Sequence, residues 1–172
     1  FSKVFIKNQP VDEYLKALME EVRHYKLPAL KTLYIGGGTP SALSAEQLDY
    51  LLTQLEYELD FSQLEEFTIE ANPGDLTADK IAVLKKSGCN RISLGVQTFD
   101  NKMLKRIGRS HNESQIYETI DSLKAAGFHN ISIDLIYGMP NMSNEKWLQN
   151  IETALSFGVP HISSYALTVE PK

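Results

Sequence analysis

The residues that point most directly to ligand binding are three consecutive glycines, Gly36-Gly37-Gly38, followed by Thr39 and Pro40. Residues without a Cβ let a ligand approach the main chain, so that backbone N–H and C=O groups can serve as hydrogen-bond partners. The run matches neither the GxGxxG pattern of dinucleotide sites nor the GxxxxGK(S/T) pattern of P-loops. It therefore predicts either a binding edge of bare backbone or a turn that lets a strand and a helix pack closely.

Two carboxylates stand inside otherwise apolar segments. Glu70 follows Phe67-Thr68-Ile69, and Asp134 lies within residues 131–136. A carboxylate that is shielded by apolar neighbours needs hydrogen-bond partners. Either group could hold a ribose hydroxyl or an amine. The alternative is a structural contact, which for Glu70 would be a loop cap or a salt bridge.

Two further polar residues follow predicted elements. Gln97 offers a neutral donor and acceptor at a strand end, and Arg109 comes just after a short helix. A fixed guanidinium could pair with a ligand carboxylate through two hydrogen bonds, or it could form a surface ion pair. The four histidines lie apart without metal-ligand spacing, and no Ser/His/Asp or Cys/His arrangement is evident. The sequence therefore indicates no catalytic residue and no metal site.

The elements that must position these residues alternate between strand and helix. Strands are predicted at residues 32–35, 64–71, 90–97, 131–137 and 161–169. Helices are predicted at residues 10–25, 77–87, 100–107, 112–126 and 143–157, and one more follows the glycines with apolar residues at helical spacing up to Leu55. This order implies right-handed crossovers and a parallel sheet.

Alternate positions in three of the strands separate an apolar set from a small or polar set. In the third strand, Ile92, Leu94 and Val96 alternate with residues such as Arg91 and Ser93. A doubly wound sheet would be apolar on both faces, whereas one layer of helices around a polar interior explains the split. We therefore predict an α/β fold, a partial (β/α) TIM-like barrel of parallel strands with its ligand at the C-terminal strand ends.

The composition restricts the classes of function. With 172 residues, of which 42% are hydrophobic and 23% charged, residues 1–172 are expected to form a single domain. The net charge of -5, without a basic run, disfavours nucleic-acid binding. No stretch approaches the ~20 apolar residues of a membrane span, and no signal-peptide pattern appears. The single Cys89 rules out an intrachain disulfide and favours a reducing, cytoplasmic compartment.

Four motifs at the predicted strand ends resemble those of the radical S-adenosylmethionine (SAM) proteins related to oxygen-independent coproporphyrinogen III oxidase. The motifs are Gly36–Pro40, Glu70–Pro73, residues 94–99 (LGVQTF) and residues 134–140 (DLIYGMP). In that family, three cysteines of a CxxxCxxC motif bind a [4Fe-4S] cluster, and S-adenosylmethionine binds the remaining iron. Reductive cleavage then gives a 5′-deoxyadenosyl radical that abstracts hydrogen. The resemblance covers nearly the whole chain and implies a barrel of the radical SAM type.

By position, the resemblance also implies a set of cofactor contacts. The methionine part of S-adenosylmethionine would be contacted by Gly37, Gly38 and Thr39. The ribose or a second region of the cofactor would be contacted by Glu70, the adenine by Ala166, and other polar groups by Gln97, Arg109 and Asp134. A backbone edge suits a zwitterion, and shielded carboxylates suit hydroxyl groups.

The sequence departs from the family at the cluster, because it contains no CxxxCxxC motif. The family motif continues as Cys-x-Phe, and the chain opens at Phe1 without a methionine. We therefore expect the cluster loop and the first strand to lie upstream, which makes residues 1–172 a truncated barrel domain. Such a fragment should bind no cluster and should be inactive alone.

Two branches of the family share these motifs. The oxidase branch decarboxylates two propionates of coproporphyrinogen III, whereas the other branch consists of haem chaperones. Residues 163–171 (SSYALTVEP) favour the haem-chaperone branch. The implied partners are S-adenosylmethionine, haem or coproporphyrinogen III, and an unidentified electron donor. The alternative from another class is a phosphate- or nucleotide-binding barrel whose glycines form an anion nest.

Overall fold

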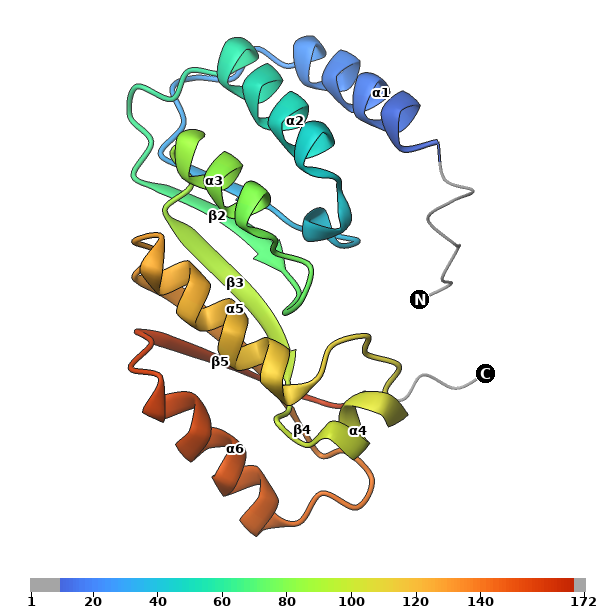
Figure 1. Cartoon of the computed structure of the whole chain (residues 1–172). Coiled ribbons are helices and arrows are strands. Elements are labelled where there is room, and N and C mark those ends of the chain that lie inside the picture. The colour runs from blue at the N-terminus through green and yellow to red at the C-terminus, as the bar shows by residue number, and fades with distance from the viewer. Residues whose placement is uncertain (1–9, 169–172) are drawn as a thin grey trace.

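The computed structural model describes residues 10–168, which form one five-stranded parallel sheet with helices between the strands (Figure 1). The strands are β1 (Thr32–Ile35), β2 (Glu66–Ala71), β3 (Arg91–Gln97), β4 (Asn130–Tyr137) and β5 (His161–Ala166). The helices are α1 (Val11–His24), α2 (Ala45–Glu58), α3 (Ala78–Lys86), α4 (Asn101–Arg106), α5 (Glu113–Ala125) and α6 (Asn144–Ser156). The strands lie side by side in chain order and every neighbouring pair is parallel, as predicted.

The predicted unit of strand, glycine loop and helix is present, with one additional turn. A 3₁₀ turn, η2 (Pro40–Ala42), directly follows the glycine loop, and its first residue is the proline whose fixed φ suits that position. Ser44 then caps α2: its Oγ accepts from the backbone N–H of Gln47, whose side chain accepts from the backbone N–H of Ser44. The glycine loop is therefore held between a strand end and a firmly capped helix.

Two strand boundaries differ from the sequence prediction by more than one residue. β2 begins at Glu66 rather than at Leu64, because the Leu64 N–H donates to Phe61 O in a preceding turn. β5 ends at Ala166 within the described residues, whereas Val169 lies outside them. The neighbouring strand β4 ends at Tyr137, the register partner of Ala166, and the Leu167 N–H donates to Tyr137 O at 2.9 Å.

One face of the sheet is apolar and carries the helices. Phe67, Leu94 and Ile133 belong to one buried cluster with residues of α2, α3, α5 and α6, such as Leu48, Leu84, Ile120 and Ala154. Helix α1 packs on α2 through a second cluster that includes Leu15 and Met19. Figure 1 shows the helices following the sheet along an open arc. No helix in residues 10–168 is long and apolar enough to cross a membrane.

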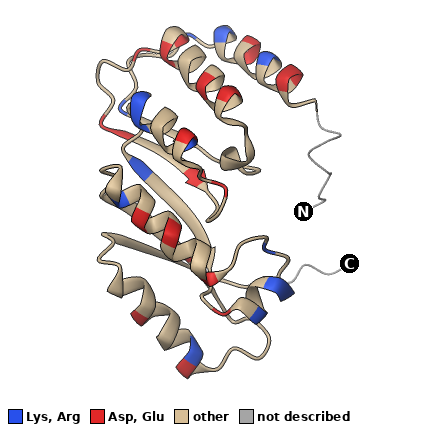
Figure 2. Ribbon diagram, viewed as in Figure 1, with Lys and Arg blue, Asp and Glu red and all other residues tan. Residues whose placement is uncertain are grey.

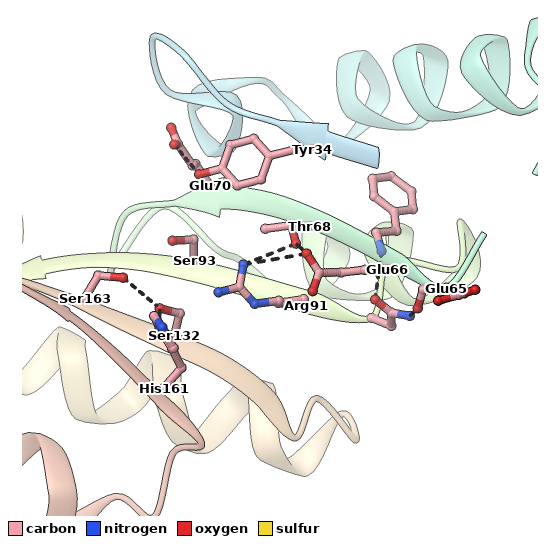
Figure 3. Close-up of polar contacts among 12 residues, drawn as sticks. Tyr34, Glu65, Glu66, Thr68, Glu70, Arg91, Ser93, Ser132, His161 and Ser163 are labelled. Carbon is pink, nitrogen blue, oxygen red and sulfur yellow. Dashed lines mark hydrogen bonds and ion pairs between the residues drawn. The ribbon is translucent and has the colours of Figure 1, made fainter. Parts of the chain in front are cut away.

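The opposite face of the same strands, which we call the inner face, is polar. Its side chains are Tyr34, Thr68, Glu70, Arg91, Ser93, Ser132, Asp134 and Ser163. Figure 3 shows most of these side chains along β2, β3, β4 and β5. The observed separation confirms the predicted split between an apolar helix-covered face and a polar interior.

Candidate functional site

The glycine loop and Glu70 form one hydrogen-bonded unit at the C-terminal ends of β1 and β2. The Tyr34 hydroxyl donates to Glu70 Oε1 at 2.5 Å (Figure 3). The backbone N–H of Gly37 donates to Glu70 Oε2 at 3.2 Å. A Cβ at Gly36 would lie 2.6 Å from Tyr34 Cε1 and 2.9 Å from the Glu70 carboxyl carbon. Gly36 is therefore required for the close approach of tyrosine and carboxylate.

The other two glycines of the loop have different tasks. Gly37 has a φ of +109°, in a region that residues with a Cβ rarely adopt. A Cβ at Gly38 would meet no atom within 4 Å, so the surface there is open. Thr39 follows and donates its hydroxyl to Gly38 O. The positive φ of Gly37 requires a residue without a Cβ in this turn, whereas close packing of strand and helix does not account for Gly38, which leaves an open backbone edge.

A second polar group gathers over Gly95, on β3. Arg109 Nη1 donates to Asn72 Oδ1 at 2.9 Å. A Cβ at Gly95 would lie 3.0 Å from Gln97 Nε2 and 3.2 Å from Asn72 Oδ1, so this glycine makes room for both amides. Gln97 itself has a φ of +71°, which is uncommon for a residue with a side chain and occurs often at functional sites. The structure thus brings the predicted residues Gln97 and Arg109 to one place.

Asn72 links the unit of the glycine loop and Glu70 to the polar group at Gly95. The sequence did not single it out as a site residue. Its backbone N–H donates to the buried Ser41 Oγ at 3.0 Å, and Ser41 donates to Asp75 Oδ2 at 3.3 Å. Lys80 Nζ donates to Ser41 O and to Asp75 O at 2.8 and 3.0 Å. These bonds fasten the loop after β1 to the loop after β2. The available signal was the motif Glu70–Pro73, which contains Asn72.

Burial lowers the pKa of both Arg109 and His111, but the two side chains differ in charge at neutral pH. Burial lowers the pKa of the half-buried Arg109, while the charges of Asp134 and Asp75 raise it, so the guanidinium stays cationic at neutral pH. Burial also lowers the pKa of His111, and its Nε2 lies 3.3 Å from Val96 O. A neutral imidazole that is protonated on Nε2 can therefore donate to the end of β3, one residue before Gln97.

Asp134 is the inner-face residue with an unmet hydrogen-bonding need. Ser93 Oγ donates to its Oδ2 at 3.0 Å, but Oδ1 is buried without a partner among residues 10–168. Burial raises the pKa of Asp134, the hydroxyls of Ser93 and Ser163 lower it, and the charge of Glu70 raises it further. A buried carboxylate oxygen without a donor is costly. Among residues 10–168, Oδ1 can therefore accept one more N–H or O–H donor.

A separate polar group occupies the other end of the inner face. Arg91 Nη1 lies 3.4 Å from Thr68 Oγ1 and 3.9 Å from Glu66 Oε1, and Ser132 Oγ lies 2.8 Å from His161 Nδ1 (Figure 3). These residues sit toward the N-terminal ends of the strands, away from the glycine loop. They partner one another and are not part of the predicted site.

The remaining predicted residue, Ala166, is exposed at the end of β5 and pairs in register with Tyr137. It lies on the far edge strand from the glycine loop, and no hydrogen bond joins it to the other predicted residues.

Charges of both signs are distributed over the helices of the described chain (Figure 2). The polar groups at the strand ends therefore stand out by their geometry and not by an excess of one charge.

Metal-binding side chains are not assembled in the described part of the chain. Residues 10–168 contain no group of three or more His, Cys, Asp or Glu residues that could hold a metal ion. Cys89 is buried in the core, and its burial raises the pKa of the thiol to about 12. A thiol in that state is not available as a thiolate ligand at neutral pH.

Comparison with known proteins identifies relatives over nearly the whole chain. Residues 5–154 match the family model described as the radical SAM superfamily. The chain is 51% identical over 170 residues to the haem chaperone HemW of Lactococcus lactis, covering 99% of this chain and 45% of the relative. It is 46% identical over 177 residues to HemW of Bacillus subtilis, covering 100% of this chain and 47% of the relative. The chain therefore spans about half the length of these curated relatives.

A solved structure supports the same assignment. Coproporphyrinogen III oxidase (HemN) from Escherichia coli, which is described as a radical SAM enzyme, superimposes with a TM-score of 0.88 at 28% sequence identity. The superposition covers 99% of this chain and 40% of the oxidase. The partial barrel predicted from the sequence thus has a solved counterpart along its whole length.

Proposed function

The chain belongs to the radical SAM superfamily, and on that premise we propose that it is the cofactor-binding barrel segment of a haem chaperone of the HemW type. Identities of 51% and 46% to two HemW proteins support the haem-chaperone branch. The oxidase alternative rests on the 28% identity to HemN. A phosphate- or nucleotide-binding barrel has no comparable support.

The observation that carries this proposal is the buried, unpartnered Oδ1 of Asp134, on the same polar face as Glu70 and the glycine loop. S-adenosylmethionine brings donors that such an oxygen needs, namely an ammonium group and ribose hydroxyls. The open backbone at Gly38 fits the methionine part, and Arg109 offers a cation to a carboxylate. The residues present therefore fit an adenosyl sulfonium ligand.

Each predicted contact then has a task in the proposal. Gly37, Gly38 and Thr39 orient the methionine part, and Glu70 accepts from hydroxyl groups. Gln97, whose amide lies close to Gly95, and Arg109, which donates to Asn72, hold further polar groups. Asp134 receives the donor that it lacks. Ala166 contributes an exposed small surface for the adenine at the end of β5. None of these residues transfers a proton in this scheme.

The [4Fe-4S] cluster that the superfamily implies needs thiolates that this chain does not contain, because Cys89 is its single cysteine. In the proposal, three cysteines from outside residues 1–172 would hold the cluster. When bound, the cluster supplies the electron for the reductive chemistry of S-adenosylmethionine, and an electron donor must reduce it. The residues of this chain bind and orient the cofactor. We place the whole protein in the cytoplasm.

The first test measures S-adenosylmethionine binding by calorimetry with the full-length, anaerobically reconstituted protein. Asp134→Asn should weaken binding about tenfold or more, because a hydrogen bond to a charged group is worth roughly 1.5–3 kcal/mol. Asp121→Asn, an equal change on the exposed side of α5, should bind like the wild type and serves as the control. Equal affinities for the wild type and Asp134→Asn would remove Asp134 from the site.

The second test separates the two branches with the same reconstituted protein. Titration with haem, followed by its visible absorbance, should show stoichiometric binding, and a decarboxylation assay with coproporphyrinogen III should show no product. Product formation would favour the oxidase.

A parallel reconstitution of residues 1–172 with iron and sulfide should give no cluster absorbance, because one cysteine cannot replace three. Cluster absorbance in that shorter chain would refute the proposed placement of the ligands.

A further inference from the structure

We propose that Tyr34 is a positioning residue that sets Glu70 as the acceptor for the vicinal diol of a ribose, and so makes the site specific for ribose over deoxyribose. The inference rests on the function proposed above, in which Glu70 faces an adenosyl ligand. Tyr34 itself need not touch the ligand. Its proposed task is to fix the orientation of the carboxylate before the ligand arrives.

The hydrogen bond between the two side chains has a defined direction. Tyr34 comes from β1 and Glu70 from β2, and the phenol oxygen lies 2.5 Å from Glu70 Oε1 (Figure 3). Burial and the hydrogen bond to Glu70 raise the pKa of Tyr34 to about 12. The phenol therefore keeps its proton at neutral pH and acts as the donor, while the carboxylate accepts.

The remaining acceptor capacity of Glu70 suits a pair of hydroxyl groups. Each oxygen of a carboxylate offers about two acceptor positions. Tyr34 occupies one position on Oε1, and the backbone N–H of Gly37 occupies one on Oε2. One position on each oxygen stays available, so a carboxylate held at both ends can accept from two neighbouring hydroxyl groups at once. Without Tyr34, the carboxylate can rotate about its terminal bond and loses this arrangement.

The backbone at Gly36 leaves the space that the hydrogen-bonded pair of Tyr34 and Glu70 needs. Any side chain at Gly36 would lie within 3 Å of both the tyrosine ring and the Glu70 carboxyl group. The first glycine of the motif therefore makes room for two protein side chains, whereas Gly38 leaves space for the ligand. A pair that only joined β1 to β2 would affect every ligand of the site equally. A positioning pair affects only ligands that carry the diol.

The experiment compares adenosine, 2′-deoxyadenosine and 3′-deoxyadenosine as probes, with dissociation constants measured by ligand-observed NMR on the full-length protein. The wild type should bind adenosine more tightly than either deoxy probe. Tyr34→Phe should weaken adenosine binding about three- to tenfold, the range expected for one hydrogen bond, and leave the deoxy probes unchanged. Tyr57→Phe, the same change at a side chain that is 83% exposed on α2, should change none of the three constants.

A second variant, Glu70→Gln, keeps the test informative if Tyr34→Phe folds poorly. Glu70→Gln should also lose the preference for adenosine, and adding Tyr34→Phe to it should cause no further loss of discrimination, since both changes act through one carboxylate. Either an equal loss of affinity for all three probes or an undiminished preference for adenosine in Tyr34→Phe would overturn this inference. Neither result would affect the proposed function. A wild type that binds neither the probes nor S-adenosylmethionine would overturn both the inference and the proposed function.

Discussion

The two faces of the sheet differ although they come from the same strands. Ile133 is fully buried in the apolar core beneath the helices, whereas the next residue, Asp134, points to the inner face with one oxygen lacking a partner. The same change of environment separates Leu94 from Ser93. The alternation shows how one short segment can contribute to stability through one residue and to binding through the next.

The two faces should therefore respond differently to substitution. On the apolar face, the loss of packing and of buried area lowers the free energy of unfolding. On the inner face, a buried polar group that awaits a ligand lowers the stability of the free protein, so its removal can stabilise the chain while weakening binding. Two measurements test this contrast, and a third tests Ser41, a residue of η2 that supports both stability and the site.

The largest effect is expected for Leu94→Ala, on the apolar face of β3. The side chain is fully buried in the main cluster, so its truncation should lower the free energy of unfolding by about 2–5 kcal/mol, as measured by urea denaturation. Leu148→Ala, at a residue that is 58% exposed on α6, should change it by less than about 0.5 kcal/mol. Similar losses at the two positions would contradict the assignment of the core.

An intermediate effect is expected for Ser41→Ala, because this buried polar residue supports both stability and the site. Its hydroxyl joins Asn72 N and Asp75 Oδ2, so the variant should lose about 1–3 kcal/mol of unfolding free energy. S-adenosylmethionine affinity should also fall, since Asn72 holds Arg109. Ser122→Ala, an exposed change on α5, is the control. A stability loss with unchanged affinity would separate Ser41 from the site.

The smallest effect concerns the pH dependence of stability in Asp134→Asn. Burial raises the pKa of Asp134 in the folded state, so the folded protein holds this proton more tightly than the unfolded chain. The stabilisation from the protonated form is complete below the unfolded value of 3.8, and it is lost as the pH rises through the folded pKa. In the absence of ligand, Asp134→Asn should therefore be the more stable protein at neutral pH.

Urea midpoints measured from pH 4 to pH 7 check this prediction. The advantage of Asp134→Asn should grow as the pH rises and should shrink toward the acid end of the range. A wild type that is the more stable protein at pH 7 would show that the charged carboxylate is satisfied in the free protein. That outcome would also remove the main support for a ligand at Asp134.

The sequence by itself determined the elements and their faces. Alternation with a period of two separates Leu94 from Ser93 and Ile133 from Asp134. Thr77 and Ser143, the first residues of two predicted helix ranges, cap α3 and α6. These features are local, because side-chain direction along a strand and capping at a helix end depend on neighbouring residues. The four motifs likewise indicated the superfamily to which the family model assigns residues 5–154.

Only the tertiary structure decided how the site residues meet. The sequence left Arg109 between a ligand carboxylate and a surface ion pair, and the structure directs it to Asn72, 37 residues away. It pairs Tyr34 with Glu70 across 36 residues, and places Gln97 at a positive φ beside Asn72. Such contacts depend on the register between parallel strands and on the path of the loops that follow them, which a residue pattern within one strand does not fix.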